Sequence, residues 1–369
     1  MGFFIEFKMS KLEQGEIALF KYNKLRFSFA NLKAGDQQIL TSDPWSLINS
    51  HLQQKISRSR GDNKIFLERS LYFSSLAESF YKAANSILLP TRATLLYYGM
   101  LNLVKCFLSY NKIELETVHE HHGLNLPLGT DSTIQVKPKS NEGVNIFATF
   151  SEILGKKITH PFNINFRQAV TNIPEIHSLC HGLGLLPKRK LLPIQIEILT
   201  NPEHNKLFTE ILIDNEQKTK VDINRFLKNE RLNYFKEGLP REGKIVYRSK
   251  SRKPYTRENM NTIYQNILKE YCKFDIAPIL TNTGYRYYVD LKTAELPHLS
   301  YTLLCMFYLG TVARYRPSEA NELLQGTLRP IVSEFVNLSP NQFLYQLCSI
   351  LLEKECVMPF SSITPMNTI

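Results

Sequence analysis

The feature that most constrains the fold is a pair of long apolar segments within residues 68–110, separated by Pro90. In the first segment the apolar residues recur at helical spacing and leave one polar face. In the second segment the polar residues form only a narrow stripe along the predicted helix. Other parts of the protein must therefore cover nearly the whole surface of this helix. The sequence therefore predicts a helical hairpin at the centre of a hydrophobic core.

The composition is that of a folded protein with a basic charge. The 369 residues include 43% hydrophobic ones, enough for one large domain or two interleaved domains. The formal net charge is +11, with 45 Lys and Arg against 34 Asp and Glu. Such an excess attracts polyanions, so RNA or DNA is an expected partner. The alternative is a basic protein without a polyanion partner.

Three observations favour a cytoplasmic protein without a membrane segment. The six cysteines form no CxxC pair, which is typical of reduced thiols. The first residues lack the uninterrupted apolar stretch of a signal peptide. The longest uncharged apolar run, residues 93–104, is shorter than the roughly 20 residues that a membrane helix needs.

Hydrophobic periodicity changes twice along the chain and predicts a mainly α fold with an α+β insertion. Residues 1–42 read as an extended arm or short strands, residues 43–128 and 297–369 as a helical bundle, and residues 129–296 as the insertion. Strands are expected at 25–29, 133–136, 144–147, 193–198, 208–213, 244–247 and 285–289. Helices are expected near 173–180, 221–234 and 257–272, and further helices open at Pro44, Pro317, Pro330 and Pro340.

Several short motifs are spread over most of the chain, and the most distinctive is the run Leu95-Leu96-Tyr97-Tyr98-Gly99-Met100. The others are Asp43-x-Trp45, Tyr81-Lys82-x-Ala84, Pro90, Leu103-x-Lys105, His122-Gly123-Leu124, Ile173-Pro174-Glu175-Ile176 and Ala313-Arg314-Tyr315. With these motifs the chain resembles the YaaC-like family, bacterial proteins of poorly defined activity. The first 40 residues and residues 244–257 match no pattern of a known family.

The same hairpin, followed by a His-Gly-Leu loop, also resembles the HEPN superfamily of helical bundles, many of which bind or cleave RNA in toxin-like or phage-defence modules. This resemblance implies a bundle built from the N- and C-terminal thirds. Active members carry an Arg followed four to six residues later by a His. Arg314 is the candidate for that Arg, but no His follows His298 in the chain. The resemblance thus implies a catalytic pair of Arg314 and a histidine brought in from elsewhere, such as His122.

Two histidine clusters leave alternatives open. Residues 119–122 place three histidines on a predicted loop, where they are solvated or structural, bind a metal, or supply a catalytic His122. His177, Cys180 and His181 share one helix face, which suits zinc, but no fourth ligand is identifiable nearby. A packed helix end that stops at His181-Gly182 is the favoured interpretation. Glycine-rich phosphate-binding motifs and the GxSxG motif are absent from the sequence, so no cofactor or metal is expected.

Residues 244–257 are strongly basic and contain two tyrosines. Cations beside aromatic rings suit a nucleic-acid backbone with exposed bases, so Arg248, Lys250, Arg252 and Lys253 are the candidate nucleic-acid-binding residues. A solvated loop between a strand and a helix is the alternative. For Arg314 and Arg316 the alternative is a structural ion pair with Glu319 or Glu322 at the end of a helix.

These observations predict a nucleic-acid-interacting, RNA-cleaving component of a bacterial stress or phage-defence system. Whether the protein is an enzyme stays open, and an enzyme of this kind would be ribonuclease-like. The alternative is a non-catalytic interaction subunit or scaffold that pairs with a separate enzyme or with itself.

Overall fold

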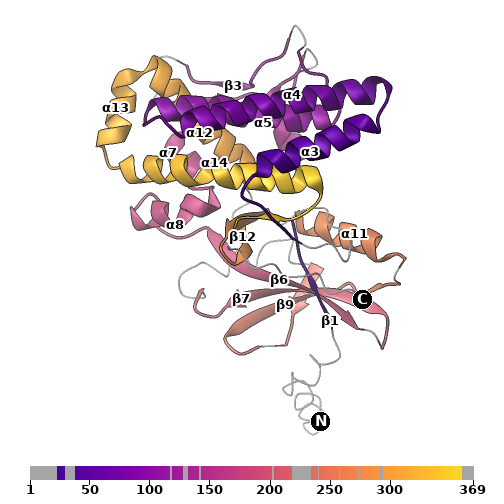
Figure 1. Ribbon diagram of the computed structural model, residues 1–369. Helices are drawn as coiled ribbons and strands as arrows, with labels where there is room; N and C mark the ends of the chain where they lie inside the picture. The colour runs from indigo at the N-terminus through magenta and orange to yellow at the C-terminus, as the bar shows by residue number, and fades with distance from the viewer. Residues whose placement is uncertain are drawn as a thin grey trace. The chain divides into compact units, whose positions relative to one another are not determined.

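The structure is a computed structural model, and it divides into two compact units (Figure 1). It describes residues 23–29, 38–116, 119–127, 132–140, 143–201, 203–217, 234–239, 241–256, 258–272, 275–290 and 294–359. Unit 1 comprises Met1–Leu40, Lys188–Thr293 and Glu353–Ile369, and unit 2 comprises Thr41–Pro187 and Ala294–Leu352. Each unit is thus assembled from segments that are distant in the sequence.

Unit 2 consists of helices and a small sheet. Its helices are α3 (Pro44–Ser57), α4 (Gly61–Ala84), α5 (Thr91–Tyr110), α6 (Ile146–Ile153), α7 (Phe166–Val170), α8 (Pro174–Gly182), α12 (His298–Tyr315), α13 (Pro317–Gln325) and α14 (Arg329–Leu352). Its strands are β3 (Leu124–Asn125), β4 (Thr133–Val136) and β5 (Phe162–Asn165). They pair antiparallel in the order β3-β4-β5.

The predicted hairpin is confirmed as α4 and α5, which pack side by side (Figure 1). Helix α5 also contacts α12 and α14 and is largely buried, as its sequence predicts. The approach of α4 requires a glycine, because a Cβ on Gly99 would lie 2.6 Å from the Tyr81 ring. The Tyr81 hydroxyl in turn donates to the Pro340 carbonyl of α14 at 3.1 Å. The hairpin therefore forms the interior of unit 2.

Local sequence signals explain some helix ends and mislead at two others. Asp43 caps α3 through the Ser46 amide at 3.2 Å, as expected. The strand predicted at 144–147 is wrong, because Asn145 caps α6 and turns these residues into a helix. The helix predicted to open at Pro340 is also wrong, since α14 runs through this proline. Residues on both sides of Pro340 are buried, so packing keeps the two halves in one helix.

Unit 1 is built on a large antiparallel sheet. Its elements are β1 (Asn23–Arg26), β2 (Ile39–Leu40), β6 (Leu191–Asn201), β7 (Lys206–Asp214), β8 (Phe235–Glu237), β9 (Lys244–Ser249), β10 (Lys253–Pro254), α11 (Met260–Cys272), β11 (Ile276–Thr281), β12 (Gly284–Asp290) and β13 (Cys356–Val357). The strand order is β11-β12-β6-β7-β9-β8, with β1 on β6 and β10 on β7. The predicted hairpin of two isoleucine-rich strands is confirmed as β6 and β7. Apolar side chains of the sheet and of α11 form one core, and β13 pairs parallel with β2.

The predicted fold class, mainly α with an α+β insertion, is wrong. The described residues contain ten helices together with an eight-stranded antiparallel sheet, so the protein is an α/β mix. The physical reason is long-range pairing: β1 from the N-terminal region pairs with β6, and the C-terminal β13 pairs with β2. The sheet therefore has its own core, to which β1, from outside residues 129–296, contributes Leu25.

Some predictions lie outside the described residues, including the arm before residue 23 and most of the helix predicted at 221–234. In the described part of the chain, no helix combines the length and the apolar character needed to cross a membrane.

Candidate functional site

Arg314 lies in the last turn of α12 and is surrounded by tyrosines. Its Nε donates to the Gly310 carbonyl at 2.9 Å, and its Nη1 donates to the Tyr98 hydroxyl. The guanidinium carbon lies 5.9 Å, 5.1 Å and 4.9 Å from the ring centres of Tyr97, Tyr98 and Tyr315. Since a guanidinium is attracted to the negative face of an aromatic ring, these contacts hold the cation in place.

Arg314 forms no ion pair with a carboxylate among the residues that the structure describes. The neighbouring Arg316 forms an ion pair instead, since its Nη1 donates to Glu319 Oε2 at 3.1 Å. The Nη2 of Arg316 donates to the carbonyls of Leu126 and Pro127. Of the two arginines, Arg316 thus occupies the structural ion pair, and the positive charge of Arg314 remains available to an anion.

His122 belongs to the same cluster through Tyr97. The His122 Nδ1 and the Tyr97 hydroxyl lie 2.8 Å apart. Burial raises the pKa of Tyr97, so its side chain is a neutral phenol at physiological pH. His122 is the only hydrogen-bond partner of this hydroxyl in the described part of the chain. Donation from the phenol to Nδ1 satisfies both groups and places the proton of the neutral imidazole on Nε2.

The charges around His122 favour its neutral form. Partial burial lowers the pKa of His122, and the positive charges of Lys105 and Arg314 lower it further, while Glu120 opposes them. Glu120 is itself paired with Lys105 at 2.6 Å, which largely cancels its charge. The imidazole is therefore a neutral donor at pH 7, with a positive guanidinium nearby.

The loop that carries His122 is attached to the start of α6. The first amides of this helix, those of Ile146 and Phe147, donate to the carbonyls of His121 and His122 at 3.0 and 3.2 Å. Asn145 accepts from the Ala148 amide at 2.9 Å and donates to the carbonyls of residues 137 and 138, each at 3.0 Å. Because helix amides and a buried side chain both hold the loop, the position of His122 is fixed by the fold.

A pocket of about 690 Å³ borders this loop. It is lined by Glu120, His121, His122, Gly123, Leu124, Asn125, Lys137, Pro138 and Ser140. His122 is partly buried on the side of Tyr97 but keeps exposed surface beside the pocket. The pocket therefore gives solutes access to the imidazole.

The structure thus brings together the two residues that the sequence nominated as a catalytic pair, His122 and Arg314. The residues that join them, Tyr97 and Tyr98, were missed as site residues, although the Tyr-Tyr-Gly run was the most distinctive signal in the hairpin. Nothing in the spacing of Tyr98 and Arg314, 216 positions apart, indicates their contact.

The nucleic-acid-binding candidates of residues 244–257 lie in unit 1 and differ from one another. Arg248 on β9 donates to the buried carboxylate of Glu210 at 2.6 Å and lies 4.6 Å from the Phe208 ring centre. Lys250 and Arg252 are exposed, whereas Lys253 lies on β10 and is only partly exposed. Only Lys250 and Arg252 of the four are thus both exposed and outside the ion pairs of the sheet.

The second histidine cluster is packed rather than open. His177 is buried, and its Nδ1 lies 2.9 Å from the Thr171 carbonyl. Cys180 is also buried. In the described ranges, no three His, Cys, Asp or Glu side chains gather closely enough to hold a metal ion.

Comparison with known proteins identifies a family but no close relative. Searches of curated proteins and of solved structures each returned no match. The likeness to HEPN bundles receives no support from these comparisons. The family model described as YaaC-like Protein matches residues 33–351, a range that holds every residue of the Arg314–His122 cluster. The chain therefore belongs to the YaaC-like family.

Proposed function

We propose that this protein binds single-stranded nucleic acid, with RNA as the expected ligand, through the cluster of Arg314, His122 and the tyrosines between them. The observation that carries the proposal is a guanidinium held by three aromatic rings and without a carboxylate partner in the described residues. Such a group is an acceptor site for a phosphate.

Tyr315 supplies the second element that a single strand needs. Its side chain is 66% exposed although it lies beside the guanidinium of Arg314. Bases stack on exposed aromatic rings with little dependence on sequence, while nearby cations bind the backbone. A nucleotide base on Tyr315 and its phosphate at Arg314 use both groups together.

The hydrogen bonds favour binding over cleavage. A ribonuclease needs a base that removes the proton of the attacking hydroxyl. The neutral His122 accepts a hydrogen bond from the Tyr97 hydroxyl at Nδ1 and carries its own proton on Nε2, so it is a donor to phosphate oxygen rather than a base. Cleavage with Arg314 steadying the phosphate and His122 as acid or base therefore remains the secondary proposal. A role in stress or phage defence also stays a prediction.

Replacement of Arg314 by alanine is expected to weaken RNA binding by at least about ten-fold, the equivalent of about 1.4 kcal/mol. The measurement is fluorescence anisotropy of a labelled single-stranded RNA with the full chain at low salt, where phosphate contacts are strongest. Tyr315→Ala is expected to weaken binding as well, because it removes the stacking surface. Arg314→Lys keeps the charge but not the planar group, and an intermediate affinity is expected.

Arg60→Ala is the matched control. Arg60 is exposed and immediately precedes α4, twenty positions before Phe80, whose ring stacks on Tyr98 at 5.6 Å. Along a helix this separation is about 30 Å, so Arg60 carries an equal charge far from the cluster. Equal affinities for Arg314→Ala, Arg60→Ala and the unaltered protein would exclude the proposed site.

RNA binding is also expected to strengthen as the pH falls from 7 to about 5. Burial and the charges of Lys105 and Arg314 hold the pKa of His122 below its usual value, so the imidazole gains its positive charge only as the pH falls below that value. The pKa of Glu120 is also lowered, by its hydrogen bonds with Lys105 and the Glu116 amide, so Glu120 stays ionised over this range. Anisotropy titrations at several pH values should show this dependence, and His122→Gln should abolish it. An unchanged slope in that variant would remove His122 from the site.

The alternative, a non-catalytic interaction subunit, predicts a different result from the same preparation. A monomer that binds RNA supports the proposal, whereas a stable oligomer that binds none supports the alternative. Size-exclusion chromatography with light scattering, followed by the anisotropy titration, distinguishes them.

A further inference from the structure

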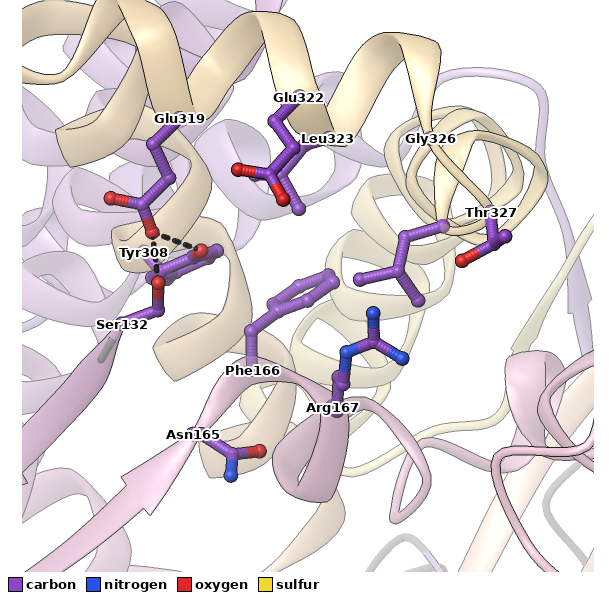
Figure 2. Close-up of a pocket in the computed structure, with 11 residues that line it drawn as sticks. Ser132, Asn165, Phe166, Arg167, Tyr308, Glu319, Glu322, Leu323, Gly326 and Thr327 are labelled. Carbon is purple, nitrogen blue, oxygen red and sulfur yellow. Dashed lines mark hydrogen bonds between the residues drawn. The ribbon is translucent and has the colours of Figure 1, made fainter.

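A second pocket in unit 2 lies between α7, α12 and α13 and has a volume of about 330 Å³ (Figure 2). Such a volume is within the range of small-molecule sites. The stacked rings of Phe166 and Tyr308, with centres 5.0 Å apart, lie on one side of it. The pocket is thus partly apolar and large enough for a small metabolite.

Glu319, the less exposed of the two carboxylates that line this pocket, already has hydrogen-bond partners within the protein. Glu319 accepts from the hydroxyls of Ser132 and Tyr308 and from the guanidinium of Arg316. These three hydrogen bonds more than offset the effect of burial, so the pKa of Glu319 is lowered and the group stays ionised. Because its charge is matched by Arg316, Glu319 shapes the pocket but has little capacity left for a ligand.

Two other charged side chains of the pocket have no ion-pair partner among the described residues. They are Glu322 on α13 and Arg167 on α7. Figure 2 shows them reaching toward the pocket from different sides. Opposite charges at a surface usually pair when they can reach each other, but these two form no ion pair, which leaves both free for a third molecule.

The short helix that carries Arg167 is held rigidly. Its N-cap residue Asn165 accepts from the Gln168 amide at 2.8 Å, and the Gln168 side chain accepts from the Asn165 amide at 3.3 Å. The opposite wall is fixed through Glu319, one turn before Glu322 on α13. Since both walls are anchored independently, the backbone positions from which the two charged side chains extend are set by the fold.

We propose that this pocket binds a small zwitterion of the amino-acid class, with its ammonium group toward Glu322 and its carboxylate toward Arg167. The Phe166–Tyr308 side of the pocket contacts the carbon skeleton. This site is separate from the nucleic-acid cluster and does not depend on it.

The test is isothermal titration calorimetry of the full chain with the standard amino acids and with β-alanine, γ-aminobutyrate and ε-aminocaproate, which space the two charges differently. At least one of these probes is expected to bind with a Kd below about 5 mM. Two analogues of the best probe are compared with it: the amine that lacks the carboxylate and the carboxylic acid that lacks the ammonium group. Each is expected to bind at least about ten-fold more weakly than the probe. If no probe binds in this range, or if a singly charged analogue binds equally well, the proposal is wrong.

Two substitutions assign the charges. Arg167→Gln and Glu322→Gln are each expected to weaken binding of the best probe by at least about ten-fold. Both residues are exposed, so the fold should tolerate the changes, and circular dichroism checks this. Arg58→Gln and Glu334→Gln, also exposed, are the matched controls and should bind like the unaltered protein. Unchanged affinity in both pocket variants would overturn the site.

Discussion

Replacement of Gly123 by alanine is expected to lower the free energy of unfolding by about 3 to 5 kcal/mol. Gly123 has a φ of +80°, a backbone conformation that costs other residues about 1 to 2 kcal/mol. In addition, its new Cβ would overlap the side-chain amide of Asn145. The second effect is the larger one, because Asn145 cannot move without losing its own contacts.

The side chain of Asn145 joins α6 to residues 137 and 138 and is only 1% exposed. Its oxygen caps α6 by accepting from Ala148, and its amide nitrogen binds the carbonyls of Lys137 and Pro138. Each hydrogen bond contributes about 1 kcal/mol, and a buried polar group left unpaired costs more. Displacement of this side chain therefore loosens α6 and the loop of His122 together.

Gly184→Ala is the matched control for this prediction. Gly184 has nearly the same φ, +77°, but a Cβ there would meet no atom within 4 Å. Only the backbone cost, about 1 to 2 kcal/mol, is expected. The single tryptophan, Trp45, packs 5.2 Å from the Tyr81 ring inside unit 2, so its fluorescence in urea reports the unfolding of that unit. If the two variants are equally stable, Asn145 does not restrict this position.

The helical hairpin could be predicted from sequence because its signal is local and long. Apolar periodicity over twenty residues defines α5, and Pro90 precedes the helix as its N-cap residue. The strands β6 and β7 could also be predicted from sequence, since isoleucines alternate along both strands and the strands are neighbours in the chain. In each case a partner close in sequence completes the pattern.

The errors arose where a residue outside the local pattern decides the structure. Residues 144–147 alternate like a strand, but the side chain of Asn145 accepts a helix amide and begins α6. Ser339 and Pro340 resemble a helix start, yet burial on both sides carries α14 through them. The fold class was wrong for the same reason, because pairing of β1 with β6 is invisible to any short window.

In the candidate site, too, residue types could be predicted from sequence but contacts between distant residues could not. His122 and Arg314 could be nominated from their residue types, but their connection depends on Tyr97 and Tyr98. The two tyrosines contact groups 25 and 216 positions away, which no spacing rule indicates. Arg248 was predicted to bind nucleic acid because it lies in a basic segment. The sequence does not show that the buried Glu210 lies opposite Arg248 and occupies its guanidinium.

Replacement of Arg248 by alanine is expected to destabilise the sheet of unit 1 by about 2 to 4 kcal/mol. Glu210, on the neighbouring strand β7, has a side chain that is only 1% exposed and is bound by Arg248 and Arg241. Removal of Arg248 leaves this carboxylate with half of its positive partners. A buried charge with too few partners is more costly than the pair was favourable, which makes this a large effect.

The charges around Glu210 act as a network. Arg241 also binds Glu197 at 2.7 Å, and Lys24 on β1 binds Glu197 at 3.0 Å. Burial alone would raise the pKa of Glu197, but the hydrogen bonds from Arg241 and Lys24 outweigh it, and the pKa lies below its usual value. Glu197 is thus ionised. Its bonds to Arg241 and Lys24, together with the bond of Arg241 to Glu210, tie together strands β1, β6 and β7.

Lys250→Ala and Arg252→Ala provide the comparison, because both residues are exposed and neither belongs to this network. Each is expected to change stability by less than about 0.5 kcal/mol. Native-state hydrogen exchange of the amides in β7 and β9 measures the effect locally, which matters because the chain has two units that need not unfold together. Equal protection in all three variants would show that Glu210 does not need Arg248.

This difference determines how the basic segment can be tested for nucleic-acid binding. If all four candidates were neutralised together, loss of binding would follow from unfolding of the sheet as readily as from loss of contacts. The double variant Lys250→Ala, Arg252→Ala removes two exposed charges and leaves the ion pairs of Glu210 intact. A phosphate contact by either residue would therefore appear as weaker RNA binding and a smaller salt dependence, with the exchange protection of β7 and β9 unchanged.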